Sequence, residues 1–360
     1  VQPTRTTNFI IKITPDTNSA TASGVTALGG MTGDVACGTG LLCTGNNISV
    51  TTPATNSGIY SKYVCPVGTL SNVYCDYTGD GTNDQVAVNA AVNAAKAVSS
   101  YSKVIMQPGN YNFSNVADIS GGNGFIFEAR GTRINGPGQQ TGIATTTNTF
   151  FIQNSNWAEF NFGLIYTNNT GTGSAIYSAG NYSETKITWQ LLQGTSRGGY
   201  GYFADTTSST TSQSVNWLTG THIQDFNRGI VLTATGVGAN IDTYRITVDY
   251  IYNNNIGIYV HGNSGGSNQI NTNTYNVNID CHFKNGDIGF QSNGWYEIIN
   301  GIIADTTTLD AGTCNNIVLD SGATSTIMNL SPQSLVTKTG SIVNNSTNTT
   351  ALINVGMPTS

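Results

Sequence analysis

Four titratable residues in the second half of the chain have the side chains that acid–base chemistry on a sugar would need: Asp225, Asp249, Asp280 and His282. Glycoside hydrolysis uses two carboxyl groups, one protonated and one ionised. Elimination on a uronate needs a base and a group that stabilises negative charge. These residues fall on successive β-like runs, so stacked strands would bring them close together. The alternative is that they are surface and turn residues, because a shift of one residue moves a side chain across the sheet.

Aromatic residues offer binding without reaction. Tyrosine and tryptophan combine an apolar ring with a polar group, so they suit ligands such as sugars that have both kinds of surface. The candidates are Trp189, Trp217, Tyr244, Tyr252 and Trp295. The competing interpretation places the same rings in the core of the fold.

Motifs for cofactor chemistry are not found in the sequence. It contains no P-loop and no H-E-x-x-H. Gly262-Asn-Ser-Gly-Gly266 is interpreted as a flexible turn, because no helix is predicted after it. We therefore predict no cofactor and no metal site.

Cysteines give information about the compartment. They fall in three pairs by position, namely Cys37 and Cys43, Cys65 and Cys75, and Cys281 and Cys314. None has a zinc-ligand spacing such as C-x₂-C. An even number permits three disulfides, although six cysteines allow 15 connectivities. Disulfides would indicate an oxidising, extracellular setting, and buried free thiols are the alternative.

Charge is scarce, at 9% of residues, with 13 basic and 19 acidic side chains and a net charge of −6. Soluble domains usually carry about a quarter charged residues. The acidic balance argues against a nucleic-acid partner and against polyanionic substrates. The 38% of hydrophobic residues, with 17 Tyr and 12 Phe, argue against disorder. No apolar run is long enough to predict a membrane span.

Short apolar runs recur at intervals typical of a coiled backbone. Aligning Ile230, Ile258, Phe290 and Val318 gives steps of 28, 32 and 28 residues. Another β-like run precedes each of them, and Asn- or Gly-rich turns separate the runs. Repeats of this length with two or three short strands predict a parallel β-helix. An antiparallel sandwich, which also has short strands and turns, is the competing fold.

One helix is predicted, over residues 84–99. Val88, Ala91, Val92 and Ala95 follow the i, i+3, i+4, i+7 pattern of an amphipathic helix. Asp84 is placed to be its N-cap.

An acidic Gly-rich loop, Asp76–Asp84, precedes this helix, and a strand–turn–strand, Lys103–Phe113, follows it. This order resembles the entry of pectate-lyase-like right-handed parallel β-helices, which viral tailspikes share; Asn83 departs from the more common Asp. The resemblance implies an all-β fold, a right-handed single-stranded parallel β-helix over residues 63–345, with the helix capping its open end.

Residues 1–62 form a separate β-rich segment in this interpretation, and residues 346–360 a polar tail. Met31–Val35, Gly38–Leu42 and Thr44–Ser49 resemble phrases that recur in tail-fibre proteins of bacterial viruses. That resemblance implies attachment to other virion or appendage proteins through the N-terminal segment. A Gly-rich linker is the alternative.

The resemblances imply an extracellular or virion-surface protein that recognises host-cell glycans and assembles as a homotrimer. The alternatives are a polysaccharide lyase or glycoside hydrolase on the same scaffold, and a structural subunit of an extracellular filament or surface layer. Because few charged residues are available for catalysis, binding is favoured over an enzymatic function. The expected partners are a host glycan, further copies of the chain and other virion proteins, with no nucleic acid.

Overall fold

A computed structural model of the chain divides into two compact units, Val1–Gly58 and Ile59–Ser360. The structure describes residues 41–44, 47–50, 60–70, 73–98, 101–207, 211–262, 269–280, 286–304, 315–323, 326–330, 342–346 and 352–355. In the first unit these residues form β1 (Leu41–Thr44) and β2 (Asn47–Val50), which pair antiparallel. The other residues of the tail-fibre-like phrases lie outside the described residues.

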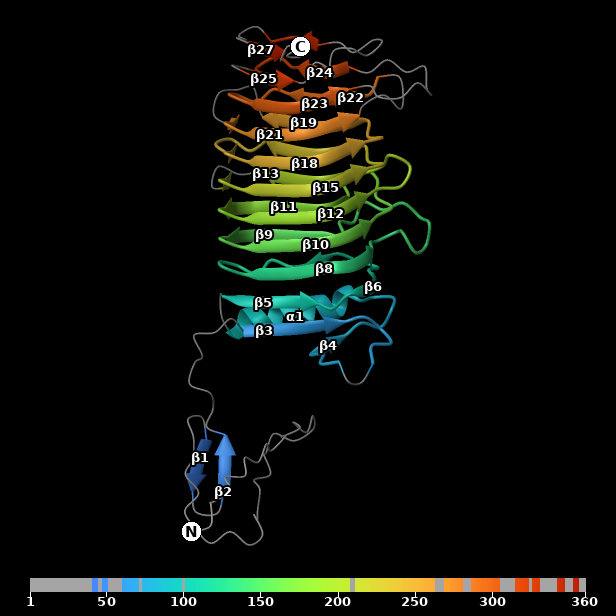
Figure 1. Cartoon of the computed structure of the whole chain (residues 1–360), viewed down its shortest axis with the longest axis vertical. Helices are drawn as coiled ribbons and strands as arrows, with labels where there is room; N and C mark the ends of the chain where they lie inside the picture. The colour runs from blue at the N-terminus through green and yellow to red at the C-terminus, as the bar shows by residue number, and fades with distance from the viewer. Residues whose placement is uncertain are drawn as a thin grey trace, which may run out of the picture. The chain divides into compact units, whose positions relative to one another are not determined.

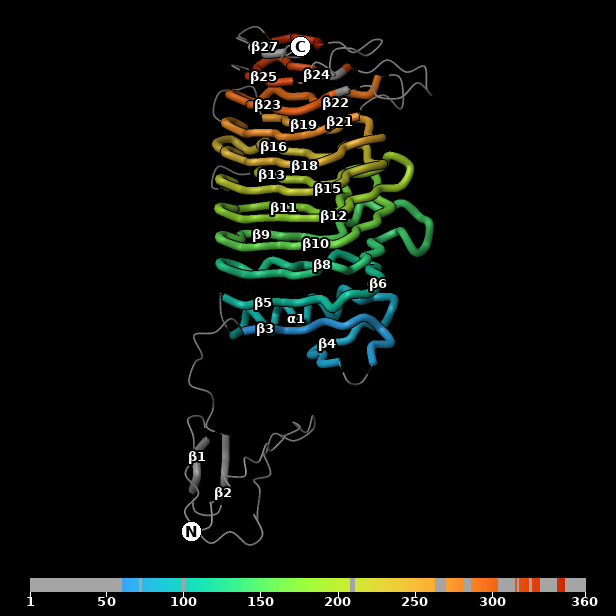
Figure 2. Tube along the Cα trace, viewed as in Figure 1, coloured from blue at the N-terminus to red at the C-terminus, as the bar shows by residue number. Residues whose placement is uncertain are grey.

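The second unit is a parallel β-helix, which confirms the predicted fold and excludes the antiparallel sandwich. Successive coils stack along one axis, so strands from neighbouring coils lie side by side (Figure 1, Figure 2). Two long parallel sheets result, which we call sheet I and sheet II. From β8 to β26, the chain alternates between one strand of sheet I and one or two strands of sheet II.

Sheet I has 13 strands. They are β3 (Tyr60–Cys65), β4 (Tyr77–Thr78), β5 (Ser102–Met106), β6 (Gly109–Asn112), β8 (Ile126–Asn135), β10 (Glu159–Tyr166), β12 (Lys186–Gln193), β15 (Trp217–Gln224), β18 (Arg245–Tyr252), β21 (Thr274–Asp280), β23 (Ile298–Ala304), β25 (Ile327–Leu330) and β27 (Leu352–Val355). The last of these, β27, pairs with β25. It lies within residues 346–360, which were predicted to be a polar tail.

Sheet II has 12 strands. They are β7 (Ala117–Asp118), β9 (Phe150–Asn156), β11 (Ser174–Ser183), β13 (Tyr200–Thr206), β14 (Ser212–Ser214), β16 (Arg228–Ala234), β17 (Asn240–Asp242), β19 (Ile256–Gly262), β20 (Gln269–Asn271), β22 (Ile288–Ser292), β24 (Asn315–Leu319) and β26 (Ile342–Asn344).

The register of sheet II confirms three of the four predicted stacking positions and corrects the fourth. Ile230 pairs with Ile258, and Ile258 pairs with Phe290. The next coil places Ile317 opposite Phe290, whereas Val318 pairs with Gln291 in the neighbouring row. The predicted Val318 was therefore one residue out of register, which in a strand moves a side chain to the opposite face.

Rings from the two sheets meet in the core. Trp189 of β12 stacks on Tyr202 of β13 with centroids 6.4 Å apart, and Tyr275 of β21 meets Phe290 of β22 edge-on at 5.0 Å. Both sheets therefore bury their inward side chains against each other within one continuous hydrophobic core.

A repeated corner precedes each of six sheet I strands. One residue two positions before the strand has a positive φ between 51° and 58° in each case: Trp157, Glu184, Val215, Thr243, Thr272 and Tyr296. The residue that follows it is buried in every coil: Ala158, Thr185, Asn216, Tyr244, Asn273 and Glu297. These left-handed corners thus turn the next side chain into the core, whatever its polarity.

The helix α1 (Gln85–Val98) confirms the predicted one, and its buried face contains Val88, Ala91, Val92 and Ala95. It packs against β3 and β5, which are neighbouring strands of sheet I. Asp84 precedes the helix, but its carboxylate accepts hydrogen bonds from the backbone N–H groups of Gly81 and Asn112, both at 2.7 Å. It therefore joins the entry loop to β6, whereas an N-cap would bond to the first turn.

One predicted cysteine pair lies within the described residues. Cys65 and Cys75 form a disulfide with Cα atoms 5.8 Å apart. The side chains of Cys37, Cys43, Cys281 and Cys314 lie outside the described residues.

Candidate functional site: an aromatic groove on sheet I

The outer face of sheet I has an interruption in the alternation of its strands. In β12, β15 and β18 two successive side chains face outward, namely Gln190 with Leu191, Thr221 with His222, and Asp249 with Tyr250. The next residue of each strand, Leu192, Ile223 or Ile251, is fully buried again. Because the interruption falls at the same place in three neighbouring coils, it widens the outward surface into a groove.

The groove has a volume of about 590 Å³ and is lined by Leu164, Gln190, Leu191, Thr221, His222, Gln224, Tyr250 and Tyr252. Leu191, His222 and Tyr250 form one row, since the register pairs each with the next. A smaller hollow of about 160 Å³ shares Leu164 and Gln190 and extends the groove to Arg133 on β8. Mixed apolar and amide lining of this kind is typical of small-molecule sites.

Three rings form the wall of the groove. Tyr250 and Tyr252 stack with centroids 4.8 Å apart and planes 29° from parallel, and His222 meets Tyr250 edge-on at 5.9 Å. Burial raises the pKa of the Tyr252 hydroxyl, the nearby Asp225 carboxylate raises it further, and the Gln224 side chain opposes the shift. Both tyrosine side chains are partly buried.

Asp225 holds the amides beside these rings. Its Oδ2 accepts hydrogen bonds from the Gln193 side chain at 3.2 Å and the Gln224 side chain at 3.1 Å, and its Oδ1 accepts one from Asn253. Asp225 itself has a positive φ of 65° at the turn after β15. Its carboxylate therefore orients Gln224 at the groove.

Three of the four predicted acid–base residues lie within the described residues, in different environments. Asp249 is exposed on β18, whereas Asp280 is buried and accepts a hydrogen bond from the Tyr250 hydroxyl at 3.2 Å. Asp225 is bonded to three amides, and His282 lies outside the described residues. Burial raises the pKa of the Glu297 carboxyl to about 8, but this side chain is fully enclosed in the core.

The five predicted sugar-binding aromatics are distributed between core and surface. Trp189 is only 3% exposed and Tyr244 is fully buried, so both side chains belong to the core. Tyr244 is turned inward by the left-handed corner at Thr243. Trp217 lies partly exposed beneath Arg245, and Trp295 donates a hydrogen bond from Nε1 to the Gly322 carbonyl at 3.0 Å. Of the five, Tyr252 lines the groove.

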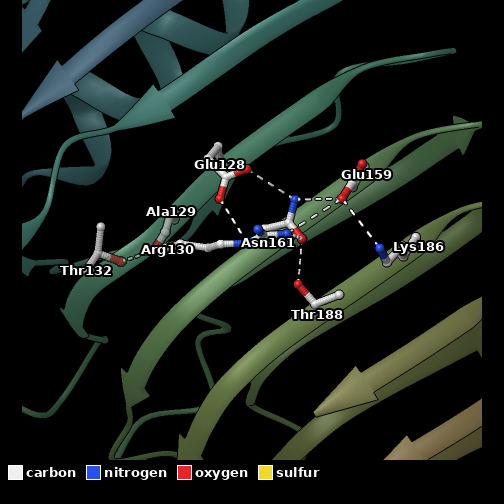
Figure 3. A network of polar contacts seen from close by, with 8 residues as sticks. All are labelled: Glu128, Ala129, Arg130, Thr132, Glu159, Asn161, Lys186 and Thr188. Carbon is white, nitrogen blue, oxygen red and sulfur yellow. Dashed lines mark hydrogen bonds and ion pairs between the residues drawn. The ribbon is translucent and has the colours of Figure 1, made fainter. Parts of the chain in front are cut away.

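A charged cluster on the same face was not among the predicted sites (Figure 3). Arg130 lies 3.2 Å from Glu128 and 3.8 Å from Glu159, and Lys186 lies 3.7 Å from Glu159. The Asn161 amide donates to both carboxylates, at 3.4 and 3.0 Å. Glycosidases use two carboxyl groups of different protonation, whereas here each carboxylate has a cation beside it. The cluster is therefore an ion-pair network across β8, β10 and β12.

His222, Tyr250 and Gln224 are site residues that the aromatic prediction missed. Their signal in the sequence was the recurrence of two polar or aromatic residues before an Ile, as in Thr221-His222-Ile223 and Asp249-Tyr250-Ile251. Within the described residues, no group of three or more His, Cys, Asp and Glu is arranged to hold a metal ion. No helix in the described part of the chain is both long and apolar enough to cross a membrane.

Comparison of the chain with protein-family models, with curated proteins and with solved structures found no match. The strand topology and the groove define the class of this protein: it is a parallel β-solenoid with an aromatic groove on one outer face.

Proposed function

We propose that this chain is an extracellular appendage protein of the viral tailspike or tail-fibre type, and that it recognises a host surface glycan. The observation that carries the proposal is the stacked pair of Tyr250 and Tyr252 beside the amides of Gln190 and Gln224 in one groove. Rings offer a flat apolar surface to a sugar, and amides both donate to and accept from its hydroxyls.

Several features support the extracellular setting and the absence of catalysis. The Cys65–Cys75 disulfide fits an oxidising compartment. Two carboxylates near the groove accept hydrogen bonds from amides or a phenol, at Asp225 and Asp280. Assembly as a homotrimer and attachment through the N-terminal segment follow from the sequence resemblances and complete the proposal.

The test is a glycan array followed by product analysis on the bound glycans. We expect saturable binding of at least one oligosaccharide without cleavage. Tyr252→Ala should weaken that binding about tenfold or more, because losing one stacked ring costs roughly 1.5 kcal/mol. Tyr296→Ala, which removes an exposed tyrosine on a different turn, is the matched control.

Cleaved products would replace the binding function with the lyase or hydrolase alternative. Filament formation with no glycan bound would favour the structural alternative. Light scattering on the intact chain tests the trimer separately, and a monomer at all concentrations would contradict that part of the proposal.

A further inference from the structure

A second cavity lies at the edge of sheet II, away from the groove on sheet I. Its volume is about 490 Å³, and the polar residues that line it are Thr235, His261, Asn293, Asp320, Ser321 and Asn345. None of them was predicted as a site residue from the sequence. The volume falls within the range of small-molecule sites in proteins.

The topology explains why these residues gather. Thr235, Asn293, Asp320 and Asn345 each follow directly after a strand of sheet II, namely β16, β22, β24 and β26. Asp320 and Asn345 extend the ladder by one bond, since their N–H groups donate to Ser292 and Leu319 at 2.8 Å. Parallel strands in neighbouring coils end at one edge of the sheet, so the residues that follow them line up along that edge.

Two of the polar groups are held in fixed orientations. The Asn293 side chain, 9% exposed, accepts from the Gly262 N–H and donates to the Gly262 carbonyl, both at 2.6 Å. The Asp320 Oδ2 accepts from the Gln291 amide at 2.8 Å, which fixes the carboxylate at the cavity. A site whose side chains are already oriented loses little conformational entropy when a ligand binds.

A ring borders the cavity on the side of β19. His261 stacks on Tyr259 with centroids 5.6 Å apart and planes 12° from parallel. The Arg228 guanidinium lies 3.8 Å from the centre of the Tyr259 ring. The Tyr259 ring therefore packs against one face of the His261 imidazole. The imidazole borders the cavity with its ring and its ring nitrogens.

We propose that this cavity is a second binding site, for a neutral polyhydroxylated molecule the size of a monosaccharide. Hydroxyl and amide side chains exchange hydrogen bonds with such a ligand in both directions, and the carboxylate accepts from its hydroxyls. An anionic ligand is disfavoured because Asp320, the one carboxylate among the described lining residues, would repel it. Calcium is disfavoured because the described lining supplies that single carboxylate, and calcium sites usually combine several oxygen ligands with more negative charge.

The test is calorimetric titration of the full chain at pH 7.5 with D-glucose, D-galactose and D-glucuronate. We expect at least one neutral hexose to bind at a single site and glucuronate to bind about tenfold more weakly or not at all. Asp320→Asn should weaken hexose binding about tenfold, because a charge-assisted hydrogen bond is replaced by a neutral one. His261→Ala removes an exposed ring and should also weaken it.

Two controls separate a specific effect at this cavity from a general effect of substitution and from misfolding. Asp118→Asn, which changes an exposed aspartate on β7, should leave monosaccharide binding unchanged. Thermal unfolding of each variant checks that the fold is kept. Hexose binding that survives Asp320→Asn and His261→Ala, a preference for glucuronate, or no binding by any of the three sugars would each overturn the proposal.

Discussion

Two buried carboxylates, ten residues apart on either side of β22, are accommodated in opposite ways. Asp287 is 3% exposed, and its Oδ2 lies 2.6 Å from the Arg197 guanidinium. Glu297 is fully buried, and its Oε1 accepts a hydrogen bond from the Asn273 amide at 3.1 Å. Among the described residues, no cation lies within ion-pair distance of Glu297.

The difference teaches how this chain tolerates ionisable groups inside a solenoid. A buried charge is costly unless it is paired or neutralised. Asp287 is paired by an arginine from the turn before β13, whereas burial raises the pKa of Glu297 to about 8, so it is largely protonated at neutral pH. Asn216 and Asn273 occupy the same corner in other coils, which shows that this position accepts a neutral amide.

The largest effect is expected from breaking the pair. Arg197→Met should lower the free energy of unfolding by about 3–5 kcal/mol, because it leaves the Asp287 carboxylate buried without its cation. Urea denaturation at pH 7 measures it. The double variant Arg197→Met with Asp287→Asn should recover part of the loss. A single variant as stable as the unmodified protein would show that the two carboxylates are not different in kind.

The second effect depends on pH. The Glu297 carboxyl has a folded-state pKa of about 8 against an ordinary value of 4.5, so between these values the folded protein holds a proton that the unfolded chain has released. Folding stability should therefore fall as pH rises through this window, by at most about 1.36 kcal/mol per pH unit.

Glu297→Gln tests this pH dependence, because glutamine has nearly the size of glutamate but no titratable carboxyl group. Unfolding measured from pH 5 to pH 8 should show a difference between the variant and the unmodified protein that grows with pH, to roughly 3 kcal/mol. A constant difference would mean that Glu297 is ionised in the fold, and the contrast with Asp287 would disappear.

The smallest loss of stability is expected at an ion pair outside the core, which can be compared with the buried Arg197–Asp287 pair. Lys186→Ala removes one ion pair of the network in Figure 3, where Lys186 and Glu159 are 3.7 Å apart and their side chains are 51% and 37% exposed. We expect a loss below about 1 kcal/mol that shrinks in high salt, since exposed pairs are weak and screened. Thermal unfolding at two salt concentrations checks this, and a loss equal to that of Arg197→Met would remove the distinction between buried and exposed pairs.

The coil pattern could be predicted from the sequence because it depends on spacing. Ile230, Ile258 and Phe290 repeat at the interval at which strands stack, and the helix face at Val88–Ala95 follows its own period. Val318 was out of register because Ile317 and Val318 are both apolar β-branched residues, so composition cannot say which one faces inward.

The site was harder to predict, for two physical reasons. The direction of Tyr244 depends on the backbone of Thr243, whose positive φ is not a preference of threonine and is imposed by the stacked corner. The outward position of His222 and Tyr250 depends on the interruption of alternation before Ile223 and Ile251, which a strict period of two does not contain. Aromatic content alone therefore assigned Trp189 and Tyr244 to a surface that they do not reach.

The regular register between neighbouring coils means that the length of the solenoid can change in steps of one whole coil. Trp217 pairs with Arg245, 28 residues later, and the corners before these two strands have the same backbone turn at Val215 and Thr243. Removing residues 217–244 would join Asn216 to Arg245 and set β18 directly on β12, shortening the axis by about 4.8 Å. Chain length can thus change in whole-coil steps while each remaining strand keeps a neighbour of the same kind.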